Sequence, residues 1–155
     1  MKTKRFIPVV FLMFVCLLTG LPASQAALEY NEMYVSEGGA KEVVLSVNQD
    51  IYLPIETSLY QYVRDLEADD YRITLITYIS GTAEEFKQYL QSINSLQGVI
   101  FVGDMPSAWF EIANDYGQYG YQTFPIDLFY MDLDGDWIDS DSNEIYDDHQ
   151  AGNGN

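Results

Sequence analysis

Three short apolar runs alternate with two stretches of helical periodicity along this chain. The runs cover residues 43–47, 71–78 and 98–103, and each is rich in β-branched side chains. Continuous apolar runs of this length are typical of strands buried on both faces of a parallel sheet. Between the runs, apolar residues recur at helical spacing from Ile55 to Leu66 and from Phe86 to Leu96. The pattern therefore predicts an α/β fold: a three-layer sandwich with a mainly parallel central sheet, in which the first strand lies between the other two.

Local signals support these boundaries. Residues 48–50, Asn-Gln-Asp, end the first run and supply helix caps, and Thr82 with Glu85 forms a capping box before the second helical stretch. Residues 123–131 (TFPIDLFYM) are predicted to form a fourth extended segment. Polar residues follow the first three runs, and we interpret them as caps and turns rather than as a catalytic group.

The first 26 residues have the three parts of a secretory signal peptide. A positive start (Lys2, Lys4, Arg5) precedes the apolar residues 6–18, and small side chains lie at Ser24 and Ala26. This apolar core of 13 residues is shorter than the ~20 that span a membrane. We therefore expect cleavage after Ala26, no stable membrane anchor afterwards, and a protein that is secreted, periplasmic or on the cell surface.

The excess of acidic over basic residues limits the kinds of molecule that the protein can bind. Residues 27–155 hold all 24 acidic residues and no cysteine, while their bases are limited to Lys41, Arg64, Arg72 and Lys87, so their formal charge is −20. Nucleic acids and anionic membranes require a positive surface, so we expect neither as a partner. A surface of this charge attracts cations instead. We expect one domain, divided into a polar lead-in segment (27–41), an α/β domain (42–131), an acidic loop (132–148) and a tail (149–155).

The acidic loop is the stretch with recognisable local chemistry, because eight of its 17 residues are acidic and none is basic. Alternating Asp and Asn side chains supply the oxygen ligands that calcium prefers, so we predict a calcium site rather than a solvated acidic stretch. The loop departs from an EF-hand, since neither Asp132 nor Asp139 is followed by Gly at the sixth position and Glu at the twelfth. The primary predicted ligands are Asp139, Asp141 and Asn143, with Asp147 next and Asp132, Asp134 and Asp136 at a neighbouring or supporting position.

Several segments together resemble the front part of secreted bacterial gingipain-type cysteine peptidases. They are residues 44–49 (VLSVNQ), 62–67 (YVRDLE), 98–106 (GVIFVGDMP), 108–110 (AWF) and 124–135 (FPIDLFYMDLDG). The resemblance covers about residues 42–148. It implies a caspase-like fold and proteolysis by a Cys nucleophile and a His, each at the end of a later strand.

The catalytic residues of that family have no counterpart here. Residues 27–155 contain no cysteine, and His149 is followed by Gln150 instead of the family's glycine, so we interpret His149 as a solvated tail residue. The chain is therefore expected to be a fragment that is inactive alone, has an uncovered sheet edge, and meets a protein or peptide substrate only through a further, catalytic half. The alternative is a non-catalytic, calcium-stabilised extracellular binding module.

Overall fold

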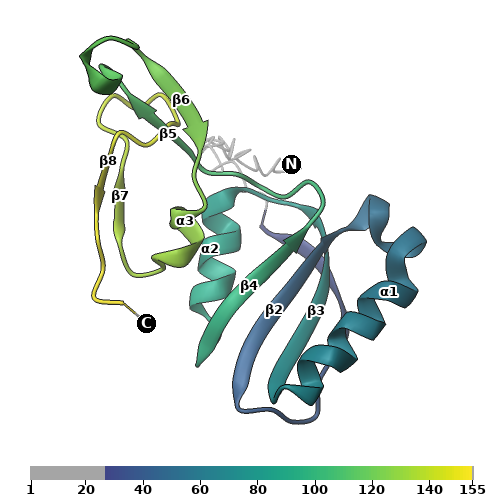
Figure 1. Ribbon diagram of the computed structural model, residues 1–155. Helices are drawn as coiled ribbons and strands as arrows, with labels where there is room; N and C mark the ends of the chain where they lie inside the picture. The colour runs from purple at the N-terminus through teal and green to yellow at the C-terminus, as the bar shows by residue number, and fades with distance from the viewer. Residues whose placement is uncertain (1–26, 155) are drawn as a thin grey trace, which may run out of the picture.

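A four-stranded mixed sheet forms the centre of the computed structural model, which describes residues 27–154 (Figure 1). Its strand order is β1-β3-β2-β4, and β2 is parallel to both β3 and β4. The predicted α/β class is confirmed, as is the position of the first apolar run between the other two. The bounds are β1 Glu29–Val35, β2 Lys41–Asn48, β3 Tyr71–Ser80 and β4 Leu96–Val102.

Strand β1 was not predicted, because it lies in the segment expected to be a polar lead-in. It pairs antiparallel with β3, with Glu29 opposite Ser80 and Val35 opposite Thr74. Its first five residues are exposed, so the strand carries no apolar face that a sequence pattern could reveal. The predicted signal peptide, residues 1–26, lies outside the described residues.

One helix covers each face of the sheet. Helix α1 (Gln49–Ala68) packs Leu59 and Val63 against the face that carries Leu45, and α2 (Ala83–Gln91) packs Phe86 against the opposite face. The predicted capping box is confirmed, since Thr82 N donates to Glu85 Oε2 at 2.8 Å and Glu85 N donates to Thr82 Oγ1 at 3.2 Å.

Helix α2 is shorter than the apolar spacing predicts. It ends at Gln91, and the chain turns at Ser95 through a positive φ of 65°. Leu96, expected on the helix, therefore begins β4.

The chain after β4 forms a separate layer of small elements, which we call the excursion (residues 103–154). Residues 123–131 were predicted to be extended, and this is correct only for their first part, because a short helix follows. The elements are β5 Trp109–Ile112, a 3₁₀ turn Asp115–Gly117, β6 Gln122–Pro125, α3 Leu128–Met131, β7 Asp136–Ile138 and β8 Asp148–Gln150.

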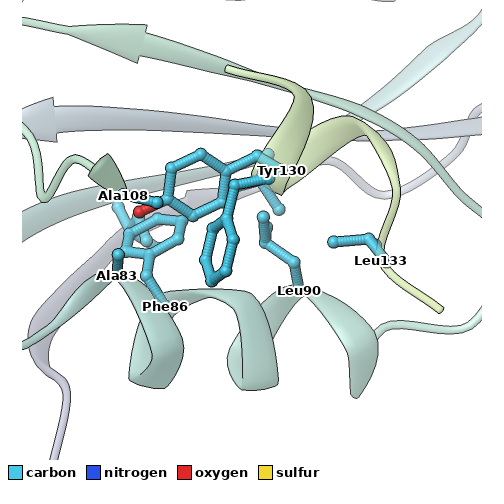
Figure 2. Packing of buried hydrophobic residues seen from close by; sticks show 9 residues of the cluster. Ala83, Phe86, Leu90, Ala108, Tyr130 and Leu133 are labelled. Atoms are coloured by element: carbon cyan, nitrogen blue, oxygen red, sulfur yellow. The ribbon is translucent and has the colours of Figure 1, made fainter. Parts of the chain in front are cut away.

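The excursion is anchored on α2 by an aromatic cluster. Figure 2 shows Tyr130 and Leu133 of the excursion facing Phe86 and Leu90 of the helix. Phe86 is fully buried, and its ring centroid lies 6.0 Å from that of Tyr130 in an edge-to-face arrangement. Burial of these side chains fixes the acidic part of the chain relative to the sheet. In residues 27–154 we found no helix with both the length and the apolar character that crossing a membrane requires.

Candidate metal centre

Strand β5 and the acidic loop are held together by backbone hydrogen bonds. Tyr146 N donates to Trp109 O at 2.9 Å, and Glu111 N donates to Tyr146 O at 2.8 Å. The other edge of β5 pairs with β6 in an antiparallel hairpin. Tyr146 thus forms a single β-bridge with the edge of β5 that does not face β6. This bridge brings the Glu111 carboxylate close to the loop residues 139–147.

Three carboxylates from this region converge on one point. One oxygen from each of Glu111, Asp141 and Asp147 lies within 4.8 Å of the other two. Calcium holds oxygens at 2.3–2.6 Å, so ligands on opposite sides of the ion are up to about 4.6–5.2 Å apart. The side chains therefore fit the dimensions of a divalent cation of that size. Glu111 is only 9% exposed, which is rare for an acid without a compensating charge.

Asp139, a primary predicted ligand, instead organises the loop. Its carboxylate accepts backbone N–H groups from Ser142 at 2.7 Å, Glu144 at 2.9 Å and Asn143 at 3.2 Å. Although burial opposes the charge, these three donors hold the pKa of Asp139 below its usual value. The contacts fold residues 139–144 into a tight turn, in which Ser142 and Glu144 take positive φ angles of 63° and 70°.

Asn143 lies among the converging carboxylates but presents its amide nitrogen to them. Nδ2 donates to Glu111 Oε2 at 3.1 Å and to Asp141 Oδ2 at 3.3 Å, while Oδ1 accepts the N–H of Ile145 at 2.8 Å. The amide thus directs the positive end of its dipole at two carboxylates. Burial first, then the charges of Glu111 and Asp139, raise the pKa of Asp141 above its usual value. A bound cation would relieve that repulsion.

The other predicted ligands lie in a second group. Asp132 Oδ2 is 2.7 Å from His149 Nε2 and accepts the N–H of Gly152 at 3.0 Å, and Asp134 Oδ2 accepts the N–H of Asn153 at 2.8 Å. Asp136 is exposed at the start of β7. The structure therefore does not bring these three acids to the Glu111 group.

His149 is not the solvated tail residue that we expected. It belongs to β8, its side chain is 17% exposed, and its ring stacks on Trp137 with centroids 4.0 Å apart. The residues beyond it are held too, because Gly152 and Asn153 bond to the acids of the turn before β7. A side chain on Gly152 would collide with the Asp134 carboxylate.

Glu111 is the site residue that the sequence analysis missed. It lies 21 residues before the acidic loop and 28 before Asp139, and no local spacing connects it to Asp139 or Asp141. One signal was available: Glu111 is the single charged residue in the otherwise apolar stretch Trp-Phe-Glu-Ile. A lone acid in such a stretch needs a buried partner.

The loop also forms one wall of a cleft of about 1130 Å³. Its other walls are the amino-terminal part of α2, residues 106–109 and residues 27–28, so it lies just beyond the carboxyl end of β3. Ligand sites of open α/β sheets collect at the carboxyl ends of the parallel strands. The side chains that line it include Thr82, Glu84, Trp109, Asp139, Glu144 and Tyr146.

Comparisons with known proteins add no relative: no family model, no curated protein and no solved structure matches this chain.

Proposed function

We propose that this chain is the amino-terminal part of a secreted gingipain-type cysteine endopeptidase, with a caspase-like three-layer fold. The observation that carries the proposal is where the resembling segments lie: on β2, on α1, on β4 and its following turn, at the start of β5, and from the end of β6 through α3 to the turn after it. Each borders the parallel part of the sheet or the aromatic cluster that attaches the excursion to it.

The described part contributes the scaffold rather than the chemistry of peptide cleavage. A thiolate must attack the peptide carbonyl and an imidazole must move the proton, and residues 27–155 have no thiol. His149 is engaged by Asp132 and stacked on Trp137, so we assign it a structural role. A protein or peptide substrate would be bound and cleaved only together with further polypeptide that supplies the catalytic groups. The cleft beside Trp109 would then form part of the substrate site.

The test is peptidase activity with and without a thiol-alkylating reagent. The purified chain of residues 27–155 is expected to cleave no peptide substrate. The longer product of the same gene is expected to cleave, and to lose cleavage on alkylation. A gene without a His-Gly and a later Cys after apolar strands would contradict the proposal, and so would alkylation-sensitive cleavage by residues 27–155 alone.

We also propose that calcium binds between the hairpin and the loop, with Glu111, Asp141 and Asp147 as carboxylate ligands. Asn143 would join them if its amide turned to present Oδ1. Asp139 shapes the loop through its three backbone contacts, and the group around Asp132 does not take part. The charge of the ion would offset the repulsion that raises the pKa of Asp141. The support is the convergence of the three carboxylates.

The size of the calcium effect follows from mass action. Extracellular calcium modules bind with dissociation constants of about 10⁻⁴–10⁻³ M. In 10 mM calcium such a site would stabilise the fold by about 1.4–2.7 kcal/mol. A domain of this length unfolds with an entropy of about 0.27 kcal/mol/K, so the melting temperature should rise by about 5–10 °C.

Thermal melts in calcium, in magnesium and in chelator measure this directly. Magnesium should act weakly, because it prefers a smaller octahedral shell that keeps its waters. The variant Asp141→Asn with Asp147→Asn should lose the calcium response, whereas Glu32→Gln, an exposed acid of β1, should keep it. Equal shifts in calcium and magnesium, or a full response in the double variant, would show that the loop is only a solvated acidic stretch.

The same carboxylate group supports a second candidate, a non-catalytic calcium-stabilised extracellular binding module. The two candidates differ in one measurable property. A binding module would keep the calcium response in its full-length form and would show no cleavage that a thiol reagent abolishes.

A further inference from the structure

The segment just before β1 lies against the amino-terminal end of α2. Glu29 pairs with Ser80 in the ladder between β1 and β3, and Ser80 Oγ donates to Glu29 Oε2 at 3.3 Å. A Cβ added at Gly81 would meet Leu28 Cα and Glu85 Oε2, each at 3.1 Å. The Leu28 backbone and the Glu85 carboxylate therefore lie next to each other over Gly81, and this close approach is possible because Gly81 has no side chain.

The core holds this segment in place. The side chain of Leu28 is partly buried and packs against the cluster of buried residues under α2. Ala27, which precedes it, is exposed, and both residues line the cleft of about 1130 Å³ described above. Because β1 begins only two residues after Ala27, the pairing of this strand keeps Ala27 at the wall of the cleft.

The cleft has an excess of negative charge. Within the part of the chain that the structure describes, no lysine, arginine or histidine lines it. Four of its lining residues are acids: Glu84, Glu85, Asp139 and Glu144. The positive end of the α2 dipole is equivalent to about half an elementary charge, so it offsets only part of this negative charge.

Glu84 stays ionised in this setting. Although burial opposes its charge, hydrogen bonds with its own backbone, with Thr82 and with Tyr146 hold the pKa of Glu84 below its usual value. Tyr146 Oη donates to Glu84 Oε1 at 2.8 Å. A positive charge at the wall of the cleft would therefore meet an ionised carboxylate there.

Cleavage of the signal peptide after Ala26 would supply that positive charge. Hydrolysis of the Ala26–Ala27 peptide bond by a signal peptidase consumes one water molecule and leaves a carboxylate on Ala26. The same step converts the uncharged amide nitrogen of Ala27 into an ammonium group. An α-amino group ordinarily titrates at about pH 7.7–8.0, so it is mostly protonated at pH 7. The group that carries the charge thus belongs to a residue that already lines the cleft.

We propose that the amino terminus released by signal-peptide cleavage, the ammonium group of Ala27, pairs with the acids at the start of α2, with Glu85 as its nearest partner and Glu84 beside it. The fold of the exported chain is thereby more stable than that of the unprocessed chain, and the cleft gains a positive charge at one wall only after processing. The inference goes beyond the proposed function, since it requires cleavage after Ala26 but neither peptidase activity nor bound calcium.

Acetylation of the amino terminus of the exported chain tests the pairing. Near neutral pH the α-amine is modified ahead of the lysines, whose ordinary pKa of about 10.4 keeps them protonated. The exported chain is expected to begin at Ala27 by mass spectrometry and to melt about 2–4 °C higher with a free than with an acetylated amino terminus. The difference should shrink in 1 M salt, where the Debye length is about 3 Å.

Charge-neutral variants identify the partner acids. In Glu84→Gln with Glu85→Gln, the difference between the free and the acetylated form should fall below about 1 °C. Gln at position 85 can keep the capping box, so α2 retains its first turn. The matched control Glu37→Gln, an exposed acid at the other end of β1, should keep the full difference.

A carbodiimide crosslink measures the contact itself in the unaltered chain. The reagent condenses an amine with a neighbouring carboxylate, so mass spectrometry should find Ala27 joined to Glu85 or Glu84. This measurement stands even where the double variant fails to fold. The melts should give the same difference in calcium and in chelator, because neither acid is a proposed calcium ligand, so their failure would leave the calcium and peptidase proposals intact.

Any one of four results would overturn the pairing. They are an exported chain that begins at another residue, equal melting temperatures of the free and the acetylated form, a full difference that persists in the double variant, and crosslinks of Ala27 only to acids outside the cleft.

Discussion

Replacing Lys87 by Met should remove one of the links between α2 and the acidic turn before β7. Lys87 is 7% exposed, and its ammonium donates to Asp132 O at 2.9 Å and to Gly135 O at 3.4 Å. It also lies 4.7 Å from the ring centroid of Phe129 and 5.6 Å from that of Trp137. Met keeps most of the apolar stem but removes the charge and all three donors.

The expected cost combines two opposing effects. Burial lowers the pKa of Lys87 despite the charges of Asp132, Asp134 and Asp136, so removing the ammonium relieves a desolvation cost. Against this, the carbonyls of Asp132 and Gly135 lose their donor, and hydrogen bonds from a charged group are worth about 1.5–3 kcal/mol. With an unfolding entropy of about 0.27 kcal/mol/K, the lost hydrogen bonds alone would lower the melting temperature by about 6–11 °C, and the relieved desolvation cost makes the observed fall smaller than this.

The assay is thermal unfolding followed by circular dichroism, with Lys41→Met as the matched control. Lys41 is exposed and its ammonium lies 5.0 Å from the Tyr71 ring centroid, so its replacement should change the melting temperature by no more than about 2 °C. If Lys87→Met melts within 2 °C of Lys41→Met, the buried ammonium does not stabilise the turn and the reasoning is wrong.

Two further predictions concern the same end of the excursion. Gly152→Ala should lower the melting temperature by several degrees, because the added methyl group collides with the Asp134 carboxylate. The control Gly38→Ala should be tolerated, since its methyl group meets nothing within 4 Å. Equal melting temperatures of the two variants would contradict the close packing at Gly152. The hydrogen bond from the N–H of Gly152, and to a smaller extent the one from His149, holds the pKa of Asp132 below its usual value. The Asp132 carboxylate therefore stabilises the fold above the usual Asp pKa of about 3.9, and this contribution is lost as the pH falls through the lowered pKa of Asp132. Melting temperatures from pH 2 to 6 should therefore fall less steeply on the acid side in Asp132→Asn than in the unaltered protein, and parallel curves would refute this.

The elements that the sequence predicts well are those with continuous apolar runs. Residues 43–47 could be assigned to a central strand because both faces of β2 are buried, and the two helical stretches then determine the crossovers and the strand order. Strand β1 could not be predicted, since it is an edge strand whose first five residues are exposed and only its last two are partly buried. Helix α3 was not predicted for a different reason: it has four residues, which are too few to show a helical periodicity of apolar side chains.

The candidate site was predictable in its composition but not in its geometry. The density of acids in residues 132–148 points to the loop that supplies Asp141 and Asp147, yet spacing alone does not show which way a carboxylate faces. Asp139 turns into its own loop, Asp132 turns to His149, and Glu111 arrives from a distant strand. Contacts between residues far apart in sequence decide all three outcomes, and a single sequence contains no record of such contacts.

The antiparallel strand β1 has a consequence for the order in which the chain can fold. Its partner β3 is complete only at Ser80, 45 residues after Val35. At a synthesis rate of about 5–20 residues per second, β1 waits about 2–9 s for that partner to exist. Its exposed Glu29, Asn31 and Glu32 make the waiting segment a poor template for aggregation, so the same polar character that makes β1 hard to predict from the sequence protects this segment until β3 is complete.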